Sequence, residues 1–389
     1  MYKVHCLNAI SSKGTDQLKG NYALTEDIKA ADAILVRSAV MHDMEVPDSL
    51  LCVARAGAGV NNIPLDAYAK KGIVVFNTPG ANANAVKELV IAGLLMAARD
   101  IHGGMEWIET FADDENIAKD AEKAKKKFAG HEIYGKTLGV IGLGAIGVLV
   151  ANAAVNLGMR VLGYDPYLSV ANAWKMSRHV EYRKDLNSML AECDYATIHV
   201  PAMDSTKGMI GVDQLNALKD GACVLNFARD ILVDEGAMED ALKSGKVRKY
   251  VTDFPNTRSV KMPSTLVLPH LGASTEESEE NCAEMAAQEI REFLETGSIR
   301  NSVNYPNCDL GQLSTPCRIT IMNDNIPDMI RQFSAVLAAR GINIVELTNK
   351  SRGEFAYTVI NPDKMVDDVL VDELSAIPGV NRVRVIKQV

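Results

Sequence analysis

A glycine motif constrains the fold of this chain more than any other feature. Gly142, Gly144 and Gly147 follow the apolar run LGVIG (138–142) and open a helical stretch. This arrangement is typical of a dinucleotide-binding turn, where the glycines allow a tight turn, close approach of a pyrophosphate and close packing of the helix on the strand. A second apolar run, RVLGYD, ends in Asp165, whose carboxylate can accept ribose hydroxyls. An acid at that position would repel a 2′-phosphate, so the motif favours NAD over NADP as the cofactor.

Short apolar runs alternate with helical stretches along most of the chain. They lie at 33–36, 50–56 and 73–76 before the motif, and at 195–200, 222–227 and 249–254 after it. The later runs predict a full nucleotide-binding domain, and the earlier ones a smaller unit of the same kind. Residues 317–389 follow the order strand, helix, two strands, helix, strand, which predicts a ferredoxin-like βαββαβ module. The predicted fold class is therefore α/β, with two doubly wound parallel-sheet domains and that module.

Composition excludes several classes of protein. The chain has 389 residues, of which 47% are hydrophobic and 23% charged, so it suits two or three globular domains. Its formal net charge of −9 argues against a nucleic-acid partner, because there is no basic excess to displace phosphate counterions. The seven cysteines are scattered without a CxxC pair, which indicates buried apolar side chains in a reducing compartment and no metal site. The chain opens on a short strand pattern and has no bilayer-spanning apolar run, so we expect a cytoplasmic protein without a membrane partner.

Five segments resemble the D-isomer-specific 2-hydroxyacid dehydrogenases. They are GKTLGVIGLGAIG (135–147), GYDPY (163–167), ATIHVPAMDSTKGMIG (196–211), LNFARDILVDEGAMEDALKSGKV (225–247) and LPHLGAST (268–275). Members of that family nest a Rossmann cofactor domain inside a flavodoxin-like substrate domain. The resemblance therefore implies a discontinuous substrate-binding domain at 1–98 and 270–303, an NAD-binding domain at 99–269, a linker at 304–316 and an ACT-like domain at 317–389.

The same resemblance implies two catalytic residues. Arg229, in NFARD, matches the arginine that grips the substrate carboxylate, for which a planar guanidinium is well suited. His270, in LPHLGAST, matches the acid/base. The family usually carries a glutamate that pairs with this histidine, but here residues 253–258 read DFPNTR and contain none. We expect Asp253 to help position the nicotinamide, and Lys261 is the alternative proton donor to His270.

Further site residues follow from the family resemblance. Those implied to contact the cofactor are Gly142, Gly144, Ala145, Ile146, Gly147, Asp165, His199, Pro201, Thr206, Phe227, Ala228, Asp253, Gly272 and Ala273. The segments RSAVMHD, RAGAGVNNI and NTPGANANAVKELV are similar to substrate loops of phosphoglycerate dehydrogenases within the family. They imply that Arg37 and Arg55 grip a phosphate, that the amides of Ala58 and Gly59 hold a carboxylate, and that Asn82 adds a hydrogen bond. A structural salt bridge is the alternative role for either arginine.

The expected reaction is NAD-dependent oxidation of D-3-phosphoglycerate to 3-phosphohydroxypyruvate, the first step of serine biosynthesis. Reduction of hydroxypyruvate, glyoxylate or another 2-keto acid is the alternative activity. A second alternative is an NAD-binding corepressor that acts through protein contacts.

The C-terminal module resembles an ACT domain, which senses amino acids in many related enzymes. Asn325 and Asn343 are the candidate effector contacts. The glycine usual after the proline of the first turn is replaced by Asp328, so binding of serine and a purely dimerising role both remain open. We expect a homo-oligomer, either a dimer or a tetramer. Because a polar linker precedes the module, we also expect truncation after Pro306 to leave a folded enzyme.

Overall fold

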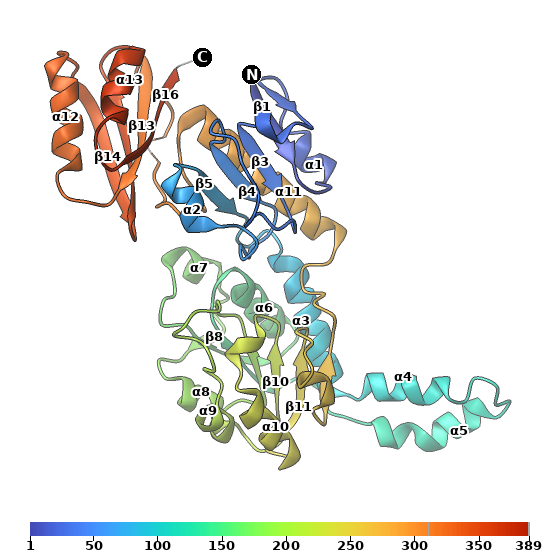
Figure 1. Ribbon diagram of the computed structural model, residues 1–389. Coiled ribbons are helices and arrows are strands. Elements are labelled where there is room, and N and C mark those ends of the chain that lie inside the picture. The colour runs from blue at the N-terminus through green and yellow to red at the C-terminus, as the bar shows by residue number, and fades with distance from the viewer. Residues whose placement is uncertain (310, 388–389) are drawn as a thin grey trace. The chain divides into compact units, whose positions relative to one another are not determined.

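The computed structural model describes residues 1–309 and 311–387 (Figure 1). The chain divides into two compact units, one formed by residues 1–82 with 276–389 and the other by residues 83–275. The sequence predicts these boundaries between residues 98 and 99 and between residues 269 and 270. The difference at the first boundary arises from helix α3 (Ala83–Ala98), whose Val86, Val90 and Leu94 pack into the core of the second unit.

A parallel five-stranded sheet forms the first part of the first unit. Its strand order is β2-β1-β3-β4-β5, the flavodoxin-like order 2-1-3-4-5. The elements are β1 (Tyr2–Cys6), α1 (Ser12–Thr15), β2 (Tyr22–Leu24), η1 (Ile28–Ala30), β3 (Ala33–Val36), β4 (Cys52–Arg55), α2 (Leu65–Lys70), β5 (Val74–Asn77) and α11 (Glu276–Thr296). Helix α11 supplies Ile290, Phe293 and Leu294 to the core on one face of the sheet. Ile34, Val53 and Val75 belong to a separate core on the other face. The expected doubly wound unit is therefore confirmed.

The second unit is built on a parallel seven-stranded sheet with the order β12-β11-β10-β9-β6-β7-β8. Its elements are α3, α4 (Ile101–Glu109), α5 (Ile117–Ala124), η2 (Lys125–Phe128), β6 (Thr137–Ile141), α6 (Ala145–Asn156), β7 (Arg160–Tyr164), α7 (Val170–Lys175), β8 (Val180–Tyr182), α8 (Leu186–Leu190), β9 (Tyr195–Ile198), α9 (Val212–Ala217), β10 (Ala222–Asn226), η3 (Asp230–Leu232), α10 (Glu235–Lys243), β11 (Val247–Thr252), η4 (Ser259–Lys261) and β12 (Thr265–Val267). Counted from β6, this is the Rossmann order 3-2-1-4-5-6 with one added strand. The order reverses between β6 and β9, which is where such folds bind ligands.

Successive residues of a strand point to opposite faces of the sheet. Helices cover both faces here, so each strand contributes side chains to two separate cores. Val140 of β6 faces the core that contains α3 and α6, whereas Ile141 faces the core that contains α8, α9 and α10. Both faces of a central strand are thus buried, which explains why the strands read as continuous apolar runs.

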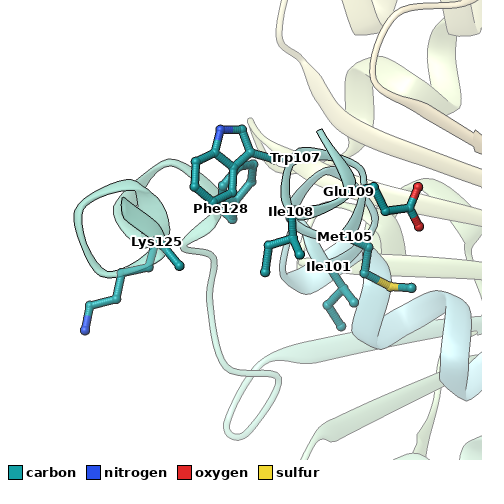
Figure 2. A pocket seen from close by; sticks show the side chains of 9 residues that line it. Ile101, Met105, Trp107, Ile108, Glu109, Lys125 and Phe128 are labelled. Carbon is teal, nitrogen blue, oxygen red and sulfur yellow. The ribbon is translucent and has the colours of Figure 1, made fainter. Parts of the chain in front are cut away.

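Helices α4 and α5 form a hairpin that extends beyond the sheet of the second unit (Figure 1). Residues 109–130, which include α5, are rich in charged side chains. The inner side of the hairpin is apolar: the Trp107 ring lies 5.9 Å from the Phe128 ring, and Ile101, Met105 and Ile108 line the same hollow of about 450 Å³ (Figure 2). The exposed fractions of Ile101, Met105 and Ile108 are 41%, 60% and 47%.

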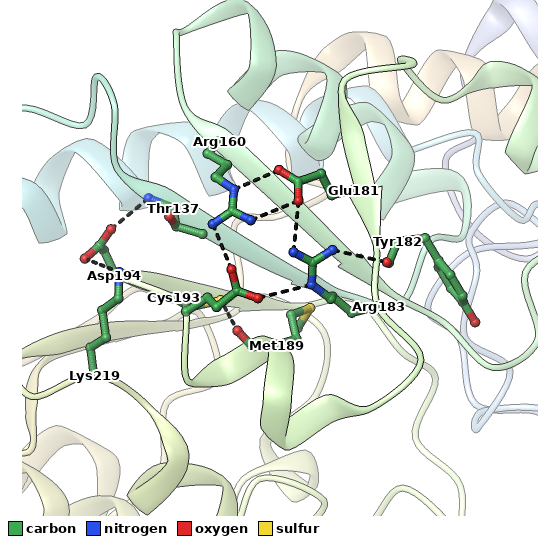
Figure 3. A network of polar contacts seen from close by, with 10 residues as sticks. Thr137, Arg160, Glu181, Tyr182, Arg183, Met189, Cys193, Asp194 and Lys219 are labelled. Carbon is green, nitrogen blue, oxygen red and sulfur yellow. Dashed lines mark hydrogen bonds and ion pairs between the residues drawn. The ribbon is translucent and has the colours of Figure 1, made fainter.

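An ion-pair network holds the outer strands of the second sheet (Figure 3). Arg160 donates two hydrogen bonds to Glu181, at 2.7 and 2.9 Å, and a third to Glu192 at 2.8 Å. Arg183 contacts the same two carboxylates. The two guanidinium groups lower the pKa of Glu181 to about 2. Arg160 opens β7 and Glu192 precedes β9, so the network ties together the amino-terminal ends of these strands, opposite to the ends that face the ligand crevice.

The C-terminal segment has the expected βαββαβ order. It consists of β13 (Cys317–Asp324), α12 (Met329–Ala339), β14 (Ile344–Arg352), β15 (Phe355–Pro362), α13 (Asp368–Ser375) and β16 (Val380–Lys387), in an antiparallel sheet of order β14-β15-β13-β16. Residues 388 and 389 of the expected module, and residue 310 of the expected linker, lie outside the described residues. One face of this sheet packs on α12 and α13 through Ile319, Phe333 and Leu370.

The other face of this sheet joins the core of the first unit. Met322, Phe355 and Tyr357 cluster with Phe76 and Phe293. Polar contacts accompany this packing: Arg318 donates to Thr296 O at 2.7 Å, Tyr357 to Gly297 O at 2.7 Å, and Arg384 to Leu294 O at 3.3 Å. Three side chains of the sheet therefore donate to backbone carbonyls at or directly after the C-terminal end of α11, where a helix leaves carbonyls without backbone partners.

The beginning of the expected linker is also packed against this core. Asn304 is buried and donates to Ile73 O at 2.9 Å, and Tyr305 donates to Ala69 O at 2.7 Å. Cys308 and Ile299 exchange backbone hydrogen bonds. The first residues of the expected linker at 304–316 are therefore packed on the first unit, because the Asn304 and Tyr305 side chains satisfy its buried carbonyls.

Candidate functional site

The glycine turn after β6 has the conformation that a pyrophosphate site requires. Gly142 has φ of +92°, and a Cβ there would lie 2.8 Å from the backbone of His199. A Cβ on Gly147 would lie 1.9 Å from the carbonyl oxygen of Gly142, so only glycine lets α6 begin so close to the strand. A Cβ on Gly144 would meet nothing within 4 Å. Open space over Gly144, at the N-terminus of a twelve-residue helix, fits a bound pyrophosphate.

Asp165 lies directly after β7 and is held by backbone amides. One carboxylate oxygen accepts from Leu143 N at 2.8 Å and the other from Tyr167 N at 2.8 Å. The first bond ties the acid to the glycine turn itself. Each oxygen keeps a further lone pair, so the carboxylate can still accept two ribose hydroxyls.

His199 follows β9 at the reversal point of the sheet. Its Nε2 lies 2.9 Å from Thr197 Oγ1, and its Nδ1 is buried without a partner among the described residues. Burial lowers the pKa of His199 to about 3, so the imidazole is neutral at physiological pH. Nearby, Thr206 closes the loop by donating to Pro201 O at 2.7 Å. The three predicted contacts His199, Pro201 and Thr206 therefore lie on an ordered loop at the carboxyl end of the sheet.

Arg229 is held by a residue that sequence reasoning missed. Asn226, at the buried end of β10, accepts from Ala228 N at 3.2 Å and donates to Arg229 O at 2.8 Å. This turn exposes the Arg229 guanidinium while its backbone is fixed. An asparagine directly after a buried strand is a recognisable turn signal and could have been read from the sequence. The ring of Phe227 points into the core, so this residue has only its backbone available to a cofactor.

Asp253 and His270 meet at the ends of β11 and β12. Asp253 is 1% exposed, and one of its oxygens accepts from Gly272 N at 2.9 Å. Its backbone carbonyl accepts from His270 N at 2.9 Å. Burial raises the pKa of Asp253, and its second oxygen has no hydrogen-bond partner among the described residues. His270 is exposed and has φ of +51°, in the left-handed region. The buried acid thus fixes the backbone that presents the imidazole.

The predicted substrate residues of the first unit lie at the ends of β3 and β4. Arg55 donates to Arg37 O at 2.9 Å and also to Gly59 O. The Arg37 guanidinium pairs with Glu279 in the first turn of α11. Asn77 donates to Ala58 O at 2.5 Å. The structure therefore brings these loops together, with Arg37 already in a salt bridge. Asn82 is half-buried at the end of this segment.

Comparison with known proteins identifies the family. Residues 91–272 match the family model described as D-isomer specific 2-hydroxyacid dehydrogenase, NAD binding domain. A D-3-phosphoglycerate dehydrogenase of Methanocaldococcus jannaschii is 38% identical over 78% of this chain and 58% of its own length. A Schizosaccharomyces pombe protein, provisionally named as the same enzyme, is 30% identical over 86% of this chain and 74% of its own length. The chain belongs to the D-isomer-specific 2-hydroxyacid dehydrogenase family.

A solved structure of the family agrees with this assignment. The NAD⁺-bound 3-phosphoglycerate dehydrogenase of Entamoeba histolytica has a TM-score of 0.61 and 26% identity, over 78% of this chain and 98% of that one. The expected fold class, with its NAD-binding domain, is confirmed. The chain spans little more than half the length of the first curated relatives that it matches.

The loop after Asp253 differs from the pattern of the 2-hydroxyacid dehydrogenase family. Arg258 extends to Glu239 of α10, with Nε and Nη2 at 3.0 and 2.9 Å from one carboxylate oxygen. Asn256 donates to Glu235 at 2.5 Å. Asn256 and Arg258 are thus both bound to α10. Lys261 is exposed in η4. Within the described part of the chain, no carboxylate lies at ion-pair distance from the His270 ring.

The candidate effector residues lie in loops of the C-terminal sheet. Asn325 donates to Gly353 O at 3.1 Å, and the backbone of Asn343 pairs with Asp363. Asp328 has φ of +76°, so the turn keeps the conformation that a glycine would favour although the residue is an aspartate. No group of three or more metal-ligating side chains occurs in residues 1–309 and 311–387.

Proposed function

We propose that this chain oxidises D-3-phosphoglycerate to 3-phosphohydroxypyruvate with NAD, the opening reaction of serine biosynthesis. The observation that carries the proposal is the arrangement of Arg229, Asp253 and His270 at neighbouring strand ends of an NAD-binding domain. The identity to a D-3-phosphoglycerate dehydrogenase covers 78% of this chain and so extends beyond that domain. Arg37 and Arg55 supply two cations at adjacent strand ends, as a phosphorylated substrate needs in a chain of negative net charge.

The residues fit NAD as the cofactor. The backbone amides after Gly142 would hold the pyrophosphate, Asp165 the ribose and Asp253 the carboxamide of the nicotinamide, since its second oxygen is buried without a partner. The bound cofactor supplies the hydride acceptor.

This chain's own residues then align the substrate and move its proton. Arg229 binds the carboxylate through two N–H groups and thereby fixes the C2 hydroxyl relative to His270. His270 accepts the hydroxyl proton as the C2–O bond gains double-bond character and the C2 hydrogen leaves as hydride. In the reverse direction His270 returns that proton to the keto oxygen. His199 is neutral at this end of the sheet, so it adds no competing positive charge.

An NADH-oxidation assay with matched substrates tests the proposal. We expect rapid turnover of 3-phosphohydroxypyruvate and at least tenfold lower kcat/KM for hydroxypyruvate and glyoxylate. Arg37→Gln and Arg55→Gln should lower kcat/KM for the phosphorylated substrate more than for hydroxypyruvate. Equal efficiency on the unphosphorylated acids would assign the chain to the 2-keto acid reductases, and the absence of turnover would favour a corepressor.

We further propose that the protein works as a homo-oligomer in the cytoplasm. The apolar hollow of the α4–α5 hairpin carries three large exposed side chains, which suits burial against a second copy (Figure 2). All seven cysteines are free, which fits a reducing compartment. The described residues also contain no helix long and apolar enough to cross a membrane. Light scattering should give a dimer or tetramer, and Met105→Glu should shift the mass towards the monomer if the hairpin is the contact.

A further inference from the structure

Phe254 contacts both basic side chains of the proposed active site. The centroid of its ring is 4.7 Å from the centroid of the His270 ring, at an interplanar angle of 49°. The Arg229 guanidinium carbon is 5.8 Å from the same Phe254 centroid. Arg229 comes from the end of β10, Phe254 from the end of β11 and His270 from the end of β12. One aromatic ring therefore contacts side chains from both neighbouring strands.

The position of Phe254 is fixed by its neighbours in the chain. Asp253, directly before it, is buried and bound to Gly272, while Asn256 and Arg258, after it, are bound to α10. Phe254 itself is half-buried, between an exposed Arg229 and an exposed His270. The loop therefore holds the ring in place, and the two catalytic candidates pack against it.

An aromatic face is suited to this position by its charge distribution. The face of a phenyl ring is electronegative and attracts a cation within about 6 Å of its centroid, by roughly 0.5–1 kcal/mol at exposed sites and more when water is excluded. The guanidinium is always charged, and the imidazole becomes charged when it takes the hydroxyl proton. Two cations near one substrate repel each other, so an electron-rich face between them offsets part of that repulsion. The buried Asp253 carboxylate is the other group that acts electrostatically on both cations.

We propose that Phe254 is a positioning residue that holds Arg229 and His270 at their working separation and stabilises the imidazolium through its π face. This rests on the proposed dehydrogenase function of the same site. In the described part of the chain, no carboxylate pairs with His270. The proposed role of Phe254 accounts for this, because the face of its ring attracts the imidazolium in place of a carboxylate. Phe254 takes no part in proton transfer, because a phenyl ring has no exchangeable proton.

Substitution at Phe254 tests the proposal. Phe254→Leu keeps an apolar side chain of similar size but removes the π face, whereas Phe254→Tyr keeps it. We expect Phe254→Leu to lower kcat about fivefold to thirtyfold, with the affinity for NADH, measured by fluorescence, changed less than twofold. Phe254→Tyr should keep kcat within about threefold of the wild type. Wild-type kcat in Phe254→Leu, or an equal loss in both variants, would overturn the proposal.

The test can be separated from the choice of substrate. The kinetics are measured with whichever of 3-phosphohydroxypyruvate, hydroxypyruvate and glyoxylate the wild type reduces, since the ring contacts do not depend on a phosphate. An NMR measurement needs no turnover: the ring current of Phe254 should displace the imidazole resonance of His270, identified by its loss in His270→Ala. The displacement should persist in Phe254→Tyr and vanish in Phe254→Leu. An unchanged resonance in Phe254→Leu would overturn the contact itself, whatever reaction the protein catalyses.

Discussion

Glu289, in the middle of α11, should make the stability of the first unit depend on pH. Its side chain is 5% exposed, and one oxygen accepts from Asn301 at 2.7 Å while the other has no partner among the described residues. Burial raises the pKa of Glu289 to about 8 from its ordinary value of 4.5. The folded unit therefore holds a proton at neutral pH that the unfolded chain has released.

The sign and size of the effect follow from proton linkage. Between pH 4.5 and about 8 the folded state binds one proton more than the unfolded state at this site, so the free energy of unfolding falls as pH rises. Each tenfold difference in proton affinity is worth about 1.4 kcal/mol, which makes roughly 5 kcal/mol an upper bound for the total loss. Above about pH 8 both states are ionised and the dependence ends.

Glu289→Gln should remove this dependence, because a neutral amide can still accept from Asn301. Both tryptophans, Trp107 and Trp174, lie in the second unit, so their fluorescence cannot report on α11. We would instead measure hydrogen exchange of α11 peptides by mass spectrometry at pH 6, 7 and 8.5, corrected for intrinsic exchange rates. Protection should fall with pH in the wild type and in the exposed control Glu277→Gln, and stay level in Glu289→Gln. Level protection in the wild type would refute the reasoning.

Four further predictions concern the site and the C-terminal segment. Asp165→Ala should weaken NAD binding in a titration and reduce the preference for NAD over NADP. Equal use of NADH and NADPH by the wild type would contradict the role of Asp165 in selecting NAD. Arg229→Ala should lower kcat/KM about a hundredfold, near 3 kcal/mol, with Arg229→Lys restoring only part of it; near-normal turnover would remove Arg229 from the site. His270→Ala should abolish reduction while Lys261→Ala should not, and the opposite result would move proton donation to the lysine. Truncation after Pro306 should expose the shared core and destabilise the first unit, seen as lost α11 protection, whereas a fully protected truncated protein would show that the module is separable.

The truncation prediction reverses the expectation drawn from the sequence. A polar segment and a self-contained strand pattern indicated an independent module. Periodicity identifies which residues of a strand are apolar, but not what the second face of its sheet packs against. Arg318 shows the difficulty: an arginine in a strand reads as exposed, yet it is buried and donates to Thr296 O at 2.7 Å.

The local features of the cofactor turn were predictable because its constraints are local. The backbone at Gly142 and the space around Gly147 exclude side chains for reasons contained within a few residues. Phe254 could not be placed in this way, since its role depends on two strand ends that only the folded sheet brings together. Asn226 could be predicted in part. The turn that it forms depends on local sequence, but its contact with the backbone of Arg229 is seen only in the structure.

The division of the chain has a consequence for its synthesis on the ribosome. Residues 83–275 form a continuous unit that can fold as it emerges, whereas the sheet of residues 1–82 is completed by Ile290, Phe293 and Leu294 of α11. At about 5–20 residues per second, the interval between these segments lasts roughly 10 to 40 s. During that time one apolar face of strands β1 and β3–β5 stays exposed, because the helix that covers it has not yet been synthesised. We therefore expect the nascent N-terminal sheet to be the segment that chaperones bind and that aggregates first when translation stalls before α11.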